Sequence, residues 1–174
     1  MERIIVIGNC GSGKSTLSKQ LSEITGLPLI HLDVISRGQG YWESLPREEF
    51  DKILLNELQK PQWIIDGNFN RTIPMRLLYC DTVIFFDFPR IICLHGVLKR
   101  LKKYHGTTRP DMGGNCPERF DLHFLKFVWN FNKKHRKRYY EMLEKSKADV
   151  IILKSRKDVS EFLEKLQKEK QNVN

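Results

Sequence analysis

The sequence predicts a single α/β domain built on a parallel sheet, and three observations support this fold class. Strand-like and helix-like patterns alternate along the chain, without an internal repeat or a low-complexity linker. The strand-like segments are continuous apolar runs, which are typical of parallel strands covered by helices on both faces. The chain has 174 residues, of which 40% are hydrophobic, so it is long enough for one full core and too short for two ordinary domains.

The first predicted strand leads directly into a phosphate-binding loop. The apolar run 4–7 is followed without a gap by residues 8–15, GNCGSGKS, which have the spacing G-x-x-x-x-G-K-S of a P-loop. Glycines let the backbone wrap closely around a phosphate with its N–H groups pointing inward. Lys14 is expected to reach the β- and γ-phosphates of ATP, and the Ser15 hydroxyl to bind Mg²⁺. The residues predicted to bind ATP are Gly8, Cys10, Gly11, Ser12, Gly13, Lys14, Ser15 and Thr16, together with Arg156.

A helix is expected to follow this loop, because Leu17, Leu21 and Ile24 share one helical face and Gly26 suits its C-terminal cap. The phosphates would then lie at the positive end of a helix dipole. Strand, loop and helix thus come in the order that the motif requires.

The next segments repeat the strand and helix pattern, and several strands end at an acidic residue. Residues 27–32 predict a second strand that ends at Asp33, residues 34–45 a loop, and Pro46 the start of a helix. The apolar runs 63–65 and 82–86 predict the third and fourth strands, which end at Asp66 and Asp87.

The second half of the chain is expected to carry a mobile loop between two helices. Residues 91–101 have helical spacing, whereas 106–117 contain three glycines and two prolines and no apolar period. A long helix with an apolar stripe at 120–142, a fifth strand at 149–153 and a final helix at 159–166 follow.

Charge and cysteine content limit the classes of function. The stretch 99–145 has 13 lysines and arginines against five acidic residues and so carries nearly all of the net charge of +9, which suits an anionic partner. Four cysteines without C-x-x-C spacing favour reduced thiols and a cytoplasmic location over disulfides or a zinc site. No run of about 18 apolar residues predicts a membrane span.

These motifs together resemble the adenylate-kinase-like P-loop kinases, and most closely the DNA topology modulation (FlaR-like) proteins. The resemblance covers nearly the whole chain and rests on runs in the same order, at 8–16, 31–33 (HLD), 63–68 (WIIDGN), 87–89 (DFP), 108–112 (TRPDM) and 116–119 (CPER). It implies a P-loop NTPase fold like that of the nucleoside monophosphate kinases, a three-layer α/β/α sandwich with strand order 2-3-1-4-5. It also implies one domain over 1–174, an acceptor-side insert at about 34–60 and a lid at about 104–119.

The acids at the strand ends are candidates for metal binding and catalysis. Asp66 is expected to hold Mg²⁺, alone or through water, although an Asp before Gly67 also forms turns. Asp33 lies where kinases of this kind keep a carboxylate near Mg²⁺ and the acceptor. A hydroxyl acceptor needs a base to take its proton, whereas a phosphate acceptor is already an anion at neutral pH. If Asp33 is the catalytic base, the acceptor is therefore expected to be a hydroxyl. Asp87 is either functional or only turns the chain.

The lid arginines are expected to stabilise the charge of the transferring phosphoryl group. The resemblance assigns this role to Arg100, Arg109 and Arg119, with a solvated lid surface as the alternative. Arg71 is displaced by one residue from the arginine of a related monophosphate-binding run, which weakens that role. The insert residues Arg37, Tyr41 and Trp42 fall where an acceptor would lie, although Trp42 also suits a core position.

The sequence therefore predicts an ATP- and Mg²⁺-dependent kinase that acts on a small molecule such as a nucleoside or nucleotide. The alternative is an NTP-dependent, DNA-binding regulator of DNA topology that uses the basic run 133–138. Nucleic-acid binding is not favoured, because the stripe at 120–142 leaves those charges on a solvated helix face, with Arg136 possible as a phosphate ligand.

Overall fold

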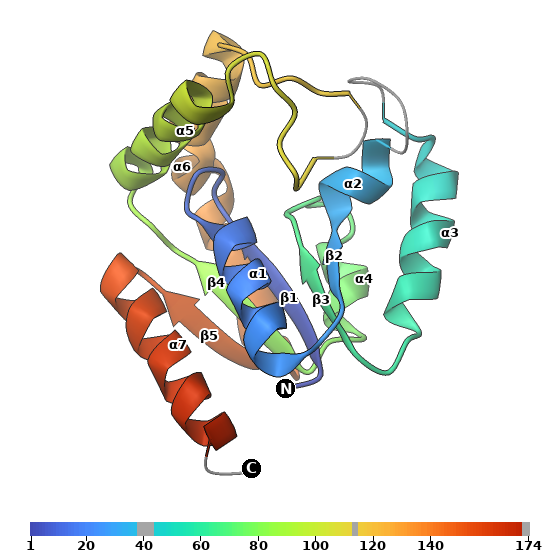
Figure 1. Cartoon of the computed structure of the whole chain (residues 1–174). Coiled ribbons are helices and arrows are strands. Elements are labelled where there is room, and N and C mark those ends of the chain that lie inside the picture. Colours follow the sequence, from blue (N-terminus) through green and yellow to red (C-terminus); the bar gives the residue numbers. More distant parts are fainter. Residues whose placement is uncertain (38–43, 113–114, 172–174) are drawn as a thin grey trace.

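The structure, a computed structural model, describes residues 1–37, 44–112 and 115–171. Five parallel strands form one sheet in the order β2-β3-β1-β4-β5, which confirms the predicted fold class and strand order (Figure 1). The strands are β1 (Arg3–Gly8), β2 (Leu29–His31), β3 (Trp63–Asp66), β4 (Thr82–Phe86) and β5 (Asp149–Leu153).

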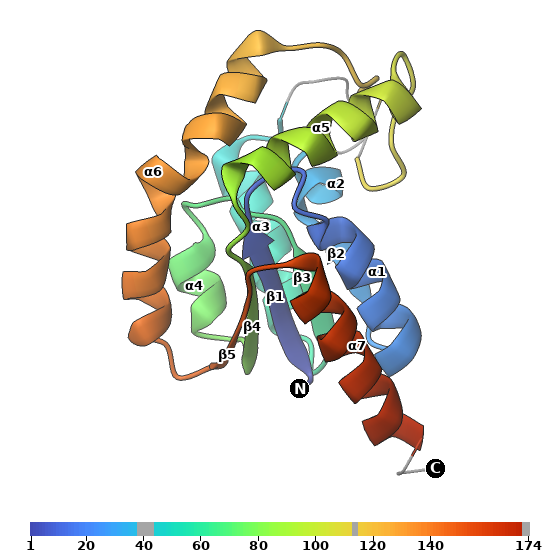
Figure 2. The same cartoon turned by 90° about the vertical axis from the view of Figure 1, so that its left-hand side faces the viewer.

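Helices cover both faces of the sheet, as the apolar strand runs predicted (Figure 2). One face packs against α3 (Arg47–Leu58), α4 (Ile73–Leu77) and α6 (Leu122–Glu144). The other face packs against α1 (Lys14–Thr25), α5 (Arg90–Tyr104) and α7 (Arg156–Gln171).

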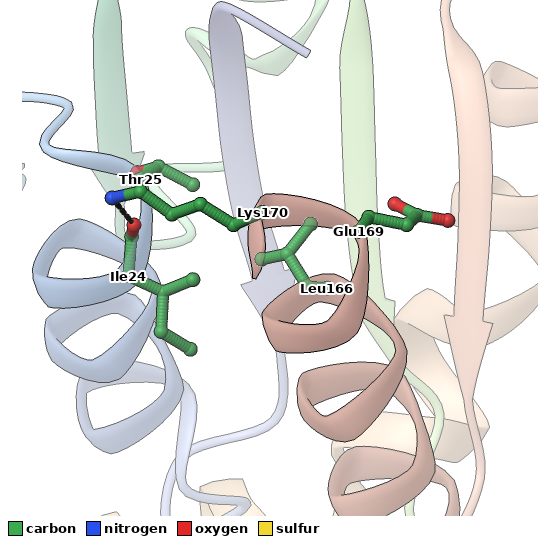
Figure 3. A pocket seen from close by; sticks show the side chains of 5 residues that line it. All are labelled: Ile24, Thr25, Leu166, Glu169 and Lys170. Carbon is green, nitrogen blue, oxygen red and sulfur yellow. Dashed lines mark hydrogen bonds between the residues drawn. The ribbon is translucent and has the colours of Figure 1, made fainter. Parts of the chain in front are cut away.

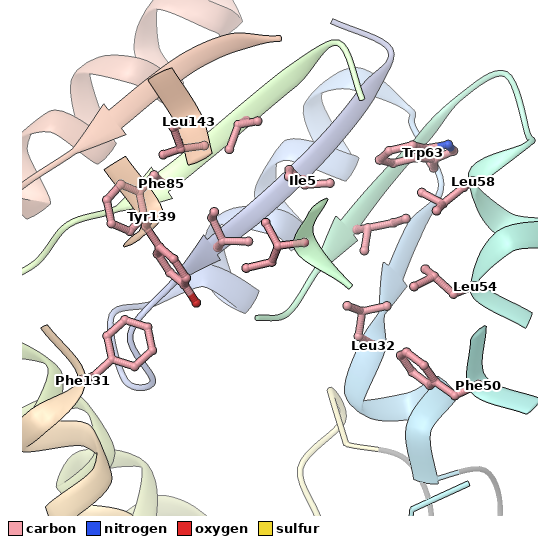
Figure 4. Close-up of a cluster of buried hydrophobic side chains, with 14 residues drawn as sticks. Ile5, Leu32, Phe50, Leu54, Leu58, Trp63, Phe85, Phe131, Tyr139 and Leu143 are labelled. Carbon is pink, nitrogen blue, oxygen red and sulfur yellow. The ribbon is translucent and has the colours of Figure 1, made fainter. Parts of the chain in front are cut away.

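Two apolar clusters hold these layers together, one on each face. Successive residues of β1 alternate between them: Ile5 and Ile7 belong to the first cluster, and Ile4 and Val6 to the second. Figure 4 shows the first cluster, where Phe50 of α3 and Phe131 of α6 approach the strands from two sides. The central strands are thus buried on both faces, which explains their continuous apolar runs.

The structure contains two short helices that the sequence analysis did not predict. The segment predicted to be strand and loop contains α2 (Leu32–Arg37), so β2 ends at His31 and Asp33 lies in the first helical turn. The unpredicted α4 follows the loop after β3. Helices of five or six residues are too short to show a clear helical period, so packing rather than sequence pattern decides them.

The first part of the apolar stripe predicted at 120–142 is less buried than expected. Phe120 and Phe127 are 57% and 41% exposed, whereas Phe131 and Tyr139 are buried. The helix runs past the end of the sheet, so only its later turns have strands to pack against (Figure 2). Among the described residues, no helix combines the length and the apolar character that a membrane crossing needs.

Candidate active site

A cleft of about 1630 Å³ lies over the carboxyl ends of the strands. Its lining residues come from the loop after β1 and from α1, from α2 and the loop after β3, from α5 and the segment between α5 and α6, and from the first turns of α6 and α7. Ligands of open α/β sheets bind at this edge, where the strand order reverses. The cleft lies where the sequence predicts the nucleotide and the acceptor.

The phosphate-binding loop forms one wall and is held by side chains from other segments. The Gly8 N–H donates to Asn68 Oδ1 over 2.9 Å, and the Asn9 side-chain amide donates to the Val128 carbonyl over 2.9 Å. Cys10, Gly11, Gly13, Lys14, Ser15 and Thr16 line the cleft, whereas Ser12 is buried. Of the predicted ATP ligands in the loop, these six therefore face the cleft.

Lys14 and Ser15 lie in the first turn of α1, as the motif predicts. The Lys14 amine donates to the Asn9 carbonyl over 2.8 Å and so bridges the loop. Arg156, the first residue of α7, lies close to this turn: a Cβ placed on Gly13 would be 2.4 Å from its Nη1. Its guanidinium also lies 5.1 Å from the Phe88 ring centroid. Two cations from different helices therefore flank the loop.

Two glycines let α5 pack directly on the loop. Gly11 has a φ of +76°, and a Cβ there would be 2.2 Å from the Cys93 carbonyl oxygen. A Cβ on Gly96 of α5 would be 2.0 Å from the Gly11 carbonyl oxygen. Any side chain at either position would push α5 away, so this contact fixes the helix that carries Arg100 relative to the loop.

The acids predicted to act in catalysis and metal binding line the same cleft. Asp66 ends β3, and Asp33 lies in the first turn of α2. Burial and the nearby Asp66 charge raise the pKa of Asp33, while Arg109, Arg37 and Lys14 oppose this rise. A carboxylate with a raised pKa is a better proton acceptor, which suits the role predicted for Asp33.

His31 is a site residue that the sequence analysis missed. Parallel pairing places it opposite Asp66, and its Nδ1 lies 3.0 Å from Asp66 Oδ2. Burial lowers the pKa of His31, but the hydrogen bond and the carboxylates of Asp66, Asp111 and Asp33 outweigh it, so the net shift is upward. Only the register of β2 against β3 brings the two residues together.

The oxygen atoms at this end of the cleft fit a magnesium ion. Asp66 is 5% exposed, and its Oδ1 is buried without a hydrogen-bond partner among the described residues. The hydroxyl-bearing Ser15 lines the same cleft. The described residues contain no group of three or more metal-binding side chains. One carboxylate and one hydroxyl in the same cleft suit Mg²⁺, which typically uses one or two carboxylates and takes its other ligands from phosphates and water.

Two of the lid arginines, Arg100 and Arg109, are paired with acids. Glu118 lies between two of them, 2.9 Å from Arg100 Nη2 and 2.9 Å from Arg109 Nε, and all three side chains are at least four-fifths buried. Arg109 also contacts Asp111 over 2.8 Å. The sequence analysis did not anticipate these pairs. Arg119 is exposed and lines the cleft beside them.

Three charged residues considered in the sequence analysis lie outside the cleft walls. The exposed Arg71 pairs with Asp51 over 2.6 Å. The buried Asp87 accepts hydrogen bonds from Arg136, 2.7 Å away, and from the Tyr140 hydroxyl. Asp87 therefore joins the end of β4 to α6, and the Arg136 guanidinium is directed toward this carboxylate. Tyr41 and Trp42 lie outside the described residues.

A second, shallower pocket of about 330 Å³ lies at the opposite end of α1 from the P-loop (Figure 3). Ile24 of α1 and Leu166 of α7 form its apolar part, and the Lys170 amine donates to the Ile24 carbonyl. It contains none of the predicted site residues and marks the place where the ends of α1 and α7 pack together.

The sheet order, the P-loop and the cleft define a P-loop kinase-like fold. Comparison with solved structures agrees: a shikimate kinase from Acinetobacter baumannii in complex with shikimate aligns with a TM-score of 0.60 and 16% identity, over 100% of this chain and 95% of that one. An uncharacterised protein from Eubacterium ventriosum aligns with a TM-score of 0.52 and 16% identity, over 99% of both chains. No protein-family model and no curated protein matches the sequence. At this identity the likeness shows the fold alone.

Proposed function

We propose that this protein is an ATP- and Mg²⁺-dependent phosphotransferase that acts on the hydroxyl group of a small molecule. One observation carries the proposal: Lys14 of the P-loop and the partly buried Asp33 face a single cleft, near enough for the Lys14 charge to lower the pKa of Asp33. A phosphate-binding cation and a proton acceptor are the two groups that transfer to a hydroxyl requires.

The residues of the cleft divide the reaction between them. The loop amides, Lys14 and Arg156 bind the phosphates of ATP, at the positive end of α1. Asp33 accepts the proton of the acceptor hydroxyl, whose oxygen bonds to the γ-phosphorus as the bond to the β-phosphate oxygen breaks and ADP leaves. Arg100, Arg109 and Arg119 stabilise the charge on the transferring group.

Magnesium, held by Ser15 and Asp66, neutralises phosphate charge when it is bound. His31 contributes indirectly, because its hydrogen bond engages Oδ2 of Asp66 and leaves Oδ1 for the metal. His31 is therefore a positioning residue for the metal ligand.

We further infer a cytoplasmic protein whose single domain spans 1–174, with the insert at 34–60 on the acceptor side and the lid at 104–119. The motif runs at 31–33, 63–68 and 108–112 support a relationship to the DNA topology modulation proteins. The structure adds no support for the alternative of a DNA-binding regulator.

The test is ADP release measured over nucleosides, nucleotides and small hydroxylated metabolites, together with ATP binding. Asp33→Asn is expected to lower turnover at least about 100-fold and to leave ATP affinity nearly unchanged, because it removes only the proton acceptor. Lys14→Ala is expected to abolish useful ATP binding. Lys165→Ala is the control, since Lys165 is 77% exposed on α7, contacts Glu169 and does not line the cleft. Unchanged ADP release by Asp33→Asn on every acceptor would overturn the proposal.

A further inference from the structure

Asn9 belongs to the P-loop, but its side chain is buried and the residue does not line the cleft. The side-chain amide donates to the carbonyl of Val128 in α6 over 2.9 Å. Both residues are buried, with exposed fractions of 1% and 0%, although they lie 119 positions apart in the chain. This hydrogen bond therefore fixes the loop after β1 to the second turn of α6.

The main chain of the same residue holds the phosphate-binding lysine. The Asn9 carbonyl accepts a hydrogen bond from the Lys14 amine over 2.8 Å. The side chain that is fixed to α6 and the carbonyl that is bonded to Lys14 thus belong to one residue. A shift of α6 at Val128 would therefore move the carbonyl that holds Lys14.

The turn of α6 that holds Asn9 also lines the cleft. Phe124 lies four residues before Val128, so the two residues are on the same side of the helix, one turn apart. Phe124 lines the cleft, and the guanidinium of Arg100 lies over its ring, 5.5 Å from the centroid. An arginine that is predicted to meet the transferring phosphoryl group thus packs on the part of α6 that holds the P-loop.

The helix that carries Arg100 is fixed to the P-loop as well. α5 packs on the backbone of Gly11, two residues after Asn9. Both helices that flank the segment predicted to be the lid are thus anchored on the loop, α5 through backbone packing and α6 through a hydrogen bond. Arg100 also pairs with Glu118 of that segment over 2.9 Å. These contacts form a continuous connection from the P-loop to the lid.

The stability of the fold alone does not account for an asparagine at this position. Oδ1 of Asn9 is buried without a hydrogen-bond partner among the residues that the structure describes, and an unpaired buried oxygen costs free energy. A leucine, which branches at the same carbon, would avoid this cost. The amide donor that reaches the Val128 carbonyl is what an asparagine adds.

We infer that Asn9 is a positioning residue for the proposed phosphoryl transfer: its amide fixes Lys14, and with it the phosphates of ATP, to the turn of α6 on which Arg100 packs. This inference rests on the proposed function. The Asn9 side chain acts through Lys14 on one side and through α6 on the other. Transfer requires that the phosphates and the lid arginines keep one relative position, because a misplacement of about 1 Å can lower a rate about 100-fold.

The test compares Asn9→Ala with Asn132→Ala. Asn132 is the matched control, because its side-chain amide also anchors α6, donating to the Phe88 carbonyl over 2.9 Å, but at a residue outside the P-loop. Each variant loses one amide–carbonyl hydrogen bond of the same helix. Urea unfolding records the stability that each variant loses.

Calorimetry measures binding of Mg²⁺ with a non-hydrolysable ATP analogue, and amide hydrogen exchange is followed in residues 122–130 with the analogue at saturation. In the unmodified protein and in Asn132→Ala, the analogue is expected to slow this exchange, because the loop and α6 are connected through Asn9. Asn9→Ala is expected to bind the analogue about tenfold more weakly, as the loss of one hydrogen bond predicts, and to show no slowing.

Asn9→Leu is the second variant, since it removes the amide and leaves no buried oxygen unpaired. It is expected to weaken binding as Asn9→Ala does, without a matching loss of stability. The inference is overturned if binding and slowing are the same in the Asn9 and Asn132 variants, if affinity follows stability in all three, or if neither Asn9 variant folds. An unmodified protein that does not bind the analogue would contradict the proposed function as well, whereas binding that does not depend on Asn9 would contradict this inference alone.

Discussion

Arg76 shows how a single buried side chain supports the site without facing it. Its side chain is fully buried behind the loop after β3 and donates to the carbonyls of Gly67 (2.9 Å) and Asn68. Burial lowers the pKa of Arg76 to about 10, so the guanidinium remains charged at neutral pH. Because Asn68 in turn accepts from the Gly8 N–H, Arg76 helps to hold the loop that touches the P-loop.

At the residue scale we therefore predict that Arg76→Met lowers the free energy of unfolding by about 2 to 4 kcal/mol, because two carbonyls lose charged donors. Urea unfolding measures this change. Arg71→Met is the matched control, since its half-exposed pair with Asp51 should contribute no more than about 1 kcal/mol. Equal stability losses in the two variants would contradict the prediction.

Backbone hydrogen bonds and ion pairs together hold the lid in place. Its base is closed by backbone hydrogen bonds between residues 106–107 and Glu118, 3.0 and 2.9 Å long. The Glu118 carboxylate contacts Arg100 and Arg109 at the same place and offsets part of their positive charge. Two of the arginines that are predicted to meet the phosphates, Arg100 and Arg109, are thus held together by one acid.

At the element scale we predict that Glu118→Gln speeds amide hydrogen exchange in residues 105–109, because two neighbouring guanidiniums then repel each other. Addition of MgATP should slow this exchange again as phosphate replaces the carboxylate. Asp111→Asn should have a smaller effect, since Arg109 keeps its contact with Glu118. Exchange rates that do not change in Glu118→Gln would show that this carboxylate does not hold the lid.

At the scale of the whole molecule, the net charge is +9, and positive side chains lie both in the cleft and on the exposed face of α6. Arg100, Arg109 and Arg119 line the cleft. Lys133, Lys134, Lys137 and Arg138 are exposed on α6 and do not line it. The positive charge therefore does not form a single surface.

We predict that replacing Lys133, Lys134, Lys137 and Arg138 by glutamine leaves ATP affinity and ADP release unchanged, because none of them faces the cleft. Filter binding to duplex DNA at several salt concentrations tests the alternative function. The DNA-binding regulator would be favoured if the DNA affinity of the unmodified protein fell steeply with salt concentration. The slope of log affinity against log salt concentration should then be smaller in the variant, by nearly one unit for each phosphate contact that is lost. Asp33→Asn, measured in the same assay, is the control for DNA binding.

The sequence alone determined the features that depend on neighbouring residues. The apolar runs of β1, β3, β4 and β5 and the loop 8–15 with its lysine were recognisable because a few adjacent residues specify each of them. The strand order came from the resemblance of several motifs in series, and the structure confirms it.

Only the tertiary structure decided which distant residues act together. His31 meets Asp66 through strand register, Arg100 and Arg109 meet Glu118 through the folded lid, and Asp87 meets Arg136 across 49 residues. Such pairs leave no local periodicity, because a side chain selects its partner by distance and burial in the folded chain. Asp87 and Glu118 look free in the sequence, but both are buried and each is paired with arginine, because an unpaired buried charge is costly.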